Sequence, residues 1–100
     1  MTKAIIVWSF EIAADQRDAF EKAYGPNGDW AQLFARSPDF IRTQLLRDAD
    51  GTYLTLDHWT EVGAFDAFKA AHASAYQELD AACGALTVKE TRIGVFESVA

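Results

Sequence analysis

The sequence predicts an α+β domain of the ferredoxin-like class, in which helices cover one face of a four-stranded antiparallel sheet. Two observations lead to this fold. Alternating runs of β-branched and aromatic residues are separated by runs with the three-to-four-residue period of helices. Their order is strand, helix, strand, strand, helix, strand, which is the βαββαβ arrangement. With 100 residues, half of them hydrophobic, the chain is expected to form a single domain over residues 1–100 with its own core.

Turn and capping residues set the expected boundaries of the elements. The GPNG segment at 25–28 is typical of a turn, and it lacks the lysine and hydroxyl residues of a phosphate-binding loop. A second turn at 48–51 ends in glycine and joins two strands into a hairpin. Asp15, Asp29 and Thr60 are expected to be N-caps, because a side-chain oxygen can accept a bond from a free N–H of the first turn. We expect strands at 3–12, 40–47, 52–59 and 87–99, and helices at 16–24, 30–36 and 61–83.

The last helix and the last strand each contain an irregular point. Aromatic and apolar side chains recur along the helix at the spacing of one continuous stripe. A capping-box pattern at 74–77 predicts that this helix breaks near His72 and begins again. Gly84 is expected to end the helix. Inside the final strand, Gly94 predicts a bulge or the close approach of another backbone.

Composition argues against several classes of partner. The formal net charge is −6 and the nine lysines and arginines are scattered, so nucleic acid and anionic membranes are not expected partners. No apolar run approaches the roughly 20 residues of a membrane span, and the N-terminus lacks the pattern of a signal peptide. The lone Cys83 cannot form an internal disulfide, so we expect a cytoplasmic protein, with a structural role for this thiol favoured over a reactive one. No spacing typical of a metal site is present, and we expect no metal.

Both faces of the predicted sheet are apolar, although the helices can cover only one. Ile5 and Val7 alternate with Ile6 and Trp8 on the first strand, and leucines alternate with aromatic residues on the third. An exposed apolar sheet face is rare on a monomer. A second copy related by a two-fold axis is the simplest cover. We therefore expect a homodimer, the alternative being a monomer with one apolar sheet face.

Three segments resemble a known family: HWTEVGAFDAF at 58–68, SPDFIRTQLLRD at 37–48 and LDAACGALTVKETRIGVFE at 79–97. Together they are similar to the antibiotic biosynthesis monooxygenase superfamily over nearly the whole chain. The similarity consists of the pattern of apolar positions, an aromatic at Trp59 and an Ala-Phe pair after it. It implies a dimeric α+β barrel. It also implies one of the activities of that family, which include cofactor-independent oxygenation of polycyclic phenols, haem degradation and quinol oxidation.

This chain differs from that family at the positions of its functional residues. Many members have a His three residues after the Ala-Phe pair, and haem-degrading members have a Trp there, where this chain has Phe68. Haem-degrading members also carry an Asn on the first strand, where this chain has Val7-Trp8-Ser9. These differences disfavour haem degradation. Since no flavin or metal motif is present either, we expect no cofactor.

His72 and Tyr76, one turn apart on the helical stripe, are the candidate catalytic residues. A neutral imidazole suits proton transfer near neutral pH, so His72 would take a proton from a bound phenol and Tyr76 would hydrogen-bond a substrate oxygen. The alternative is that His72 lies at the helix break and bonds a free carbonyl. His58 follows Asp57 directly, and adjacent strand residues point to opposite faces. These two are therefore not expected to form a dyad.

A set of large aromatic residues would form a wall for a flat ligand between helices and sheet, the alternative being plain core. These candidate ligand-binding residues are Trp8, Trp30, Phe34, Trp59 and Phe68. Two functions follow from the sequence. The first is a cofactor-independent monooxygenase acting on a small, flat phenolic or quinol-like molecule. The second is a dimeric protein that binds a small aromatic molecule in the same pocket without turnover.

Overall fold

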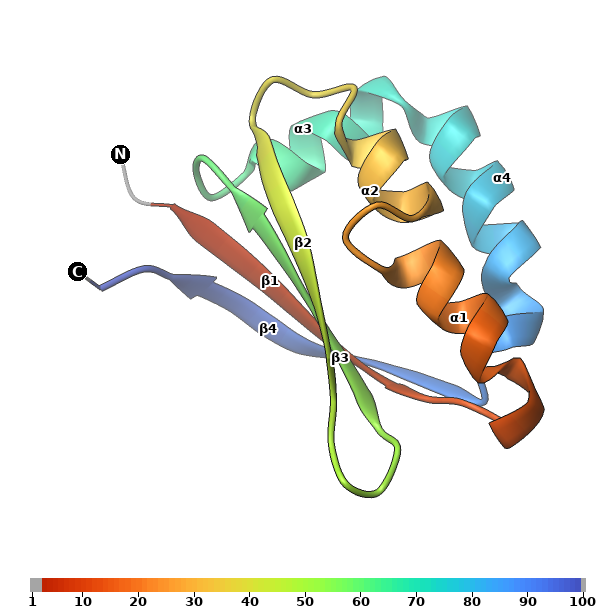
Figure 1. The fold of residues 1–100 in the computed structure, drawn as a ribbon. Coiled ribbons are helices and arrows are strands. Elements are labelled where there is room, and N and C mark those ends of the chain that lie inside the picture. The colour runs from red at the N-terminus through yellow and green to blue at the C-terminus, as the bar shows by residue number, and fades with distance from the viewer. Residues whose placement is uncertain (1–2, 100) are drawn as a thin grey trace.

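The computed structural model describes residues 3–99 and shows one sheet with the helices on one side (Figure 1). The strands are antiparallel neighbours in the order β2-β3-β1-β4. The elements are β1 (Ala4–Glu11), η1 (Ala14–Gln16), α1 (Arg17–Tyr24), α2 (Asp29–Phe34), β2 (Phe40–Arg47), β3 (Tyr53–Trp59), α3 (Ala64–Ala71), α4 (Ala73–Cys83), η2 (Gly84–Leu86) and β4 (Lys89–Glu97). This confirms the βαββαβ order and the ferredoxin-like class. Within residues 3–99, no helix is both long enough and apolar enough to cross a membrane.

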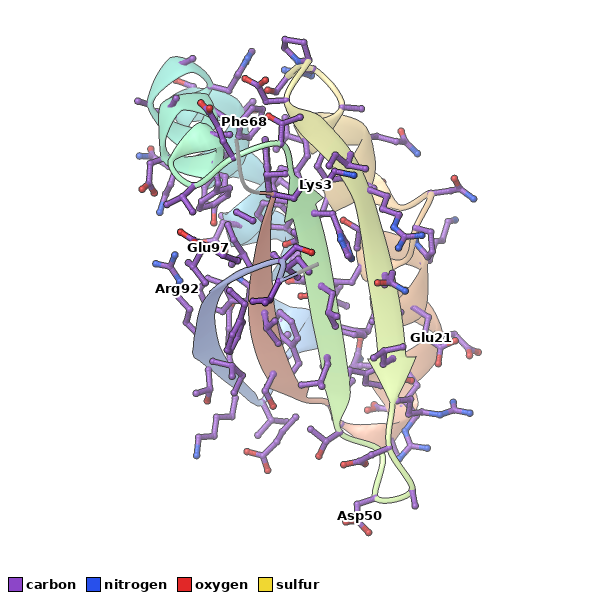
Figure 2. All side chains as sticks on the ribbon, turned by 90° about the vertical axis from the view of Figure 1, so that its left-hand side faces the viewer. Lys3, Glu21, Asp50, Phe68, Arg92 and Glu97 are labelled. Atoms are coloured by element: carbon purple, nitrogen blue, oxygen red, sulfur yellow. The ribbon has the colours of Figure 1, made fainter. Side chains whose placement is uncertain are left out.

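Burial along the central strands β1 and β3 distinguishes the two faces of the sheet. We call the more buried one the inner face and the other the open face. On β3, every second residue from Tyr53 to Trp59 is buried, and the residues between them are only half-buried. The register pairs Ala4 with Trp59 and Phe10 with Tyr53, so the buried residues of the two strands lie side by side. The inner face is the one that the helices cover. Figure 2 looks onto the open face, with β2 at one edge and β4 at the other.

The last strand is irregular at Gly94, as the sequence predicted. The pairing of β4 with β1 shifts between Val7 and Trp8, so that Val7 pairs with Gly94 and Trp8 pairs with Arg92. Ile93 is left without a partner in the ladder. A bulge of this kind bends an edge strand and increases its twist.

The three predicted N-caps are wrong. Asp15 lies inside η1, and no side-chain bond caps that turn or α1. The Thr60 hydroxyl donates instead to Asp39 Oδ1 at 3.0 Å, and its N–H donates to the Asp39 carbonyl at 2.9 Å. The helix α3 begins only after Gly63, whose φ of 95° requires the left-handed region that glycine favours. Asp29 is already the first residue of α2.

Three other irregular points are confirmed. His72 separates α3 from α4, with non-helical backbone angles of φ −121° and ψ 36°. Its N–H still donates to the Phe68 carbonyl at 2.9 Å, and its carbonyl accepts from the Tyr76 N–H at 2.9 Å. The two helices therefore follow one another without a loop. Gly51 has a φ of 86° in the hairpin turn, and Gly84 caps the end of α4.

One end of the layer between helices and sheet is closed by five aromatic rings. The Phe34 ring centroid lies 5.5 Å from those of Phe40, Trp59 and Phe68 and 5.9 Å from that of Phe65. Trp59 has no exposed surface. Tilted and edge contacts at these distances are the favourable arrangements of aromatic pairs. We call these five residues the closed aromatic end.

Candidate functional site

A cavity of about 40 Å³ lies between the inner face of the sheet and the helices. A single water molecule needs roughly 10–15 Å³ of such space, so the cavity has room for a few water-sized groups. This space is too small for a polycyclic ligand, and a single substituted ring would fill it and extend through its opening. Its wall consists of Trp8, Phe10, Tyr24, Trp30, Phe34, Thr43, Thr55, Asp57, Phe65, Tyr76, Asp80 and Glu90.

The floor of the cavity is polar, although it belongs to the buried face of the sheet. Thr43, Thr55 and Asp57 are all less than a tenth exposed. Thr43 and Asp57 are direct partners across β2 and β3, and the Thr43 hydroxyl donates to Asp57 Oδ1 at 2.7 Å. Among residues 3–99, Thr43 is the one side chain that hydrogen-bonds Asp57, and it bonds only one of the two carboxyl oxygens. One carboxyl oxygen is thus free to contact a ligand in the cavity.

Burial changes the acidity of Asp57. Removal from water raises the pKa of this carboxyl from 3.8 to about 6, and the hydrogen bond from Thr43 opposes part of that increase. At neutral pH the group is therefore largely ionised and yet basic enough to accept a proton. General bases work best with a pKa close to the working pH. Asp57 has the burial, the free oxygen and the acidity of such a base.

The helices supply hydrogen-bond donors to the same cavity. Burial raises the pKa of Tyr76 to about 12 and also raises the pKa of Tyr24, so both phenols keep their protons at neutral pH. The Trp30 ring centroid lies 6.0 Å from that of Tyr24 and 5.1 Å from that of Tyr76. In the described part of the chain, the Trp30 indole N–H has no acceptor. The two phenol hydroxyls can donate to oxygen atoms of a bound molecule.

The mouth of the cavity is formed by two exposed carboxyl residues, Asp80 on α4 and Glu90 on β4. Partial burial, together with the neighbouring Asp80 carboxylate, raises the pKa of Glu90. The mouth is therefore acidic, and the deeper wall is aromatic down to the polar floor.

The structure separates the sequence-predicted residues into two groups. Trp8, Trp30, Phe34 and Tyr76 line the cavity. The others lie outside its wall. Trp59 and Phe68 belong to the closed aromatic end, and the His72 ring is stacked on the Phe68 ring with a centroid distance of 4.8 Å. His72 thus has a packing position at the helix junction, where the alternative from the sequence placed it, but the bond from its ring to a free carbonyl is not seen among the described residues.

Sequence reasoning missed Asp57, which the structure places at the centre of the site. The available signal was its position on β3, where it shares one face with Tyr53, Thr55 and Trp59. Recognising it required knowing that this face, and not the face with the two leucines, is covered by helices. Its neighbour His58 lies on the open face, where Nε2 is 2.7 Å from Gln44 Oε1. The expectation that Asp57 and His58 form no dyad agrees with this geometry.

The described residues contain no group of three or more histidine, cysteine or acidic side chains placed to hold a metal ion. Cys83 is buried at the end of α4. Burial raises the pKa of this thiol, which lowers its reactivity.

An α+β domain with an aromatic cavity between its two layers is the class that this geometry defines, and solved structures of that class match the chain. A mutant of SnoaB, a cofactor-independent oxygenase from Streptomyces nogalater, is 25% identical over 98% of this chain and 94% of that chain, with a TM-score of 0.69. SnoaB without that mutation is 24% identical over 100% of this chain and 96% of that chain, with a TM-score of 0.70. A protein assigned to the antibiotic biosynthesis monooxygenases from Bordetella bronchiseptica is 16% identical, with full coverage of both chains and a TM-score of 0.76.

The antibiotic biosynthesis monooxygenase resemblance seen in the sequence is thus confirmed at the level of the fold. No protein-family model matches the chain, and no curated protein matches it. The solved neighbours show the fold, and a substrate must be argued from the cavity.

Proposed function

We propose that the protein is a cofactor-independent monooxygenase that acts on a small, flat, electron-rich phenol or quinol in the cavity above Asp57. The observation that carries this proposal is a buried carboxyl with one free oxygen in the floor of an aromatic cavity. The likeness to SnoaB, a cofactor-independent oxygenase, supports the same class of reaction.

The proposed reaction begins with proton transfer. The Asp57 carboxylate takes the phenolic proton, and the phenolate gives one electron to dioxygen. The radical pair then joins at a ring carbon that carries a hydrogen, which forms a peroxide. That carbon loses its hydrogen as a proton while the O–O bond breaks. One oxygen atom remains as the second carbonyl of a quinone, and the other leaves as water with the two released protons, so one phenol and one dioxygen give one quinone and one water.

The wall supports this sequence in two ways. Its aromatic rings exclude water from the anion, which strengthens electrostatic interactions inside the cavity. The Tyr76 hydroxyl, protonated because burial raises its pKa to about 12, can donate a hydrogen bond to the developing oxyanion. Tyr76 therefore keeps the role that the sequence proposed, and the role of base passes from His72 to Asp57.

Oxygen uptake tests the proposal. Methoxyphenols with a free ortho or para ring carbon are supplied under labelled dioxygen, with an enzyme-free sample to correct for autoxidation. One labelled atom is expected in the quinone and one in water. Asp57→Asn should lower the enzymatic rate by about 10²–10⁴-fold, the usual contribution of a general base. His72→Ala, outside the cavity wall, should retain the rate.

The outcomes separate the two functions. Normal turnover by Asp57→Asn together with loss of turnover in His72→Ala would return the base to His72. Tight binding of these phenols with no oxygen uptake by the wild-type protein would support a binding protein without turnover.

We also propose that two copies pair through the open face of the sheet. Leu46, Ile93 and Phe96 are between 47% and 52% exposed, and Leu54 and Leu56 are half-buried on β3 between them. Apolar surface of this kind is rare on a monomer, and a two-fold axis would cover it in both copies at once. The native mass measured by light scattering tests this proposal, and the mass of one chain would contradict it.

A further inference from the structure

The cavity combines aromatic walls with acidic groups and includes no basic residue. Of the residues that line it, seven are aromatic, three carry carboxyl groups and two are threonines. Aromatic faces attract cations through their negative quadrupole, and this attraction is strongest where water is excluded. Carboxylates in the same wall add a direct charge interaction. Both features favour a ligand that carries a positive charge.

The three carboxyl groups are arranged from the mouth to the floor. Asp80 and Glu90 are exposed at the mouth, and Asp57 is buried in the floor with one oxygen unpartnered among residues 3–99. An acidic entrance attracts positively charged molecules and repels anions. A ligand that enters therefore meets negative charge on arrival and again where it comes to rest.

Two basic side chains contact or pair with residues of the wall without lining the cavity themselves. Lys69 on α3 places its Nζ atom 4.8 Å from the centroid of the Tyr76 ring, and Arg92 directly precedes the bulge at the β4 edge of the sheet (Figure 2). Neither residue lines the cavity. The contact with Lys69 also shows that the Tyr76 ring already holds one cation on its surface. No basic group inside the wall is thus available to bind a carboxylate or a phosphate.

We propose that this cavity selects a small aromatic ligand that carries a protonated amino group, and that it rejects anionic aromatic ligands of the same size. This inference deepens the proposed oxygenase and rests on its assignment of the cavity as the substrate site. The amino group would be held at the mouth by Asp80 and Glu90, with the ring between the aromatic walls. The phenolic oxygen would then lie toward Asp57 in the floor.

Three probes that share one phenol ring and differ in charge test this inference. They are 4-hydroxybenzylamine, which is a cation, 4-hydroxybenzyl alcohol, which is neutral, and 4-hydroxybenzoate, which is an anion. Dissociation constants are measured by calorimetry at pH 7.5 and low salt. We expect the amine to bind at least about tenfold more tightly than the alcohol, which corresponds to about 1.4 kcal/mol, and the anion to bind more weakly than both.

Charge-neutralising variants sharpen the test. Asp80→Asn and Glu90→Gln should each reduce the advantage of the amine several-fold and leave the affinity for the alcohol nearly unchanged. Glu97→Gln is the matched control, because Glu97 lies on β4 and outside the cavity wall and its replacement changes the net charge equally. An equal loss in Glu97→Gln would overturn the inference, because the effect would then come from net charge alone.

The binding measurements on the wild-type protein test the inference even if a variant fails to fold. Equal affinity for amine and alcohol, tighter binding of the anion, or binding of none of the three would overturn the inference. Oxygen uptake with neutral phenols and no preference for the amine would overturn the charge selection and leave the proposed oxygenase intact. Selective binding of the amine without any oxygen uptake would support the charge selection and contradict the oxygenase.

Discussion

Each face of the sheet carries, in its central part, a few groups of the polarity that is usual for the other face. The inner face, which the helices cover, carries Thr43, Thr55 and Asp57 in its centre. The open face (Figure 2) carries the two leucines of β3, and Phe96 on the edge strand β4 is 49% exposed. A chain selected only for stability as a monomer would place these groups the other way round.

This difference indicates a separate function for each face. Burying a carboxyl is unfavourable unless it is fully hydrogen-bonded, and Asp57 has one oxygen without a partner among the described residues. Such a group is retained where its altered acidity is useful. Apolar groups left in water on the open face are equally unfavourable unless a partner covers them. The inner face thus fits chemistry, and the open face fits association.

The largest expected effect concerns the stability that the protein loses by burying the ionised Asp57 in the inner face. Because the folded protein raises the pKa of Asp57 from 3.8 to about 6, its folded state binds this proton more tightly than the unfolded chain does. The associated stability is fully present below pH 3.8 and is lost as the pH rises to about 6. Asp57→Asn avoids the buried charge. We expect it to be more stable than the wild type above pH 6 by up to about 3 kcal/mol, with the difference vanishing near pH 4.

Urea unfolding at pH 4 and pH 7.5, at one protein concentration, measures this difference. Asp66→Asn on the exposed side of α3 is the matched control, because it removes the same formal charge from the surface. If Asp57→Asn is destabilising at pH 7.5 by as much as at pH 4, the carboxyl is not a strained group and the comparison of the two faces fails.

The raised pKa of Asp57 should also control the rate of turnover. A base must be ionised to accept a proton, so the rate of oxygen uptake at saturating phenol should rise with pH and level off above a midpoint near 6. Below that midpoint the rate is expected to fall about tenfold per pH unit, and so about a hundredfold between pH 6 and pH 4. A rate that does not vary over this range would exclude Asp57 as the base.

A charge placed on the open face should break association without changing the cavity. Leu56 lies in the centre of that face on β3, so Leu56→Lys would bury a charge between two copies. We expect the assembly to dissociate, with a loss of about 2–3 kcal/mol in association free energy. Gln77→Lys on the exposed surface of α4 is the control. Sedimentation velocity distinguishes the two, and an unchanged mass in Leu56→Lys would place the partner elsewhere.

The comparison of the two faces also explains which features the sequence could predict. The order of elements and the hairpin turn follow from local periodicity and from glycines such as Gly51, and these were predicted correctly. The Thr60 cap was wrong because its hydroxyl bonds to Asp39, a residue distant in the chain. Nothing local to 60–64 reveals that contact.

The candidate site was predicted only in part for a related reason. The aromatic residues of the wall are recognisable from their size, and Trp8, Trp30 and Phe34 were predicted for it. Asp57 was not, because an acidic residue in an alternating strand normally faces water. Its face is decided by pairing with β1, whose Ile6 is its direct partner and is itself buried. A single strand therefore cannot show which of its faces becomes the floor of a cavity.

The smallest expected effect tests how a neighbour on the inner face sets the pKa of Asp57. The bond from the Thr43 hydroxyl to Asp57 Oδ1 stabilises the ionised carboxyl and so lowers its pKa. Thr43→Val removes the hydroxyl and keeps the shape of the side chain. The midpoint of the rate profile should then move upward by up to about one pH unit, equivalent to about 1.4 kcal/mol. Thr55→Val, which changes a floor residue with no side-chain bond to Asp57, should leave the midpoint in place. An equal shift in both variants would mean that the polarity of the floor as a whole, and not this hydrogen bond, sets the acidity of the base.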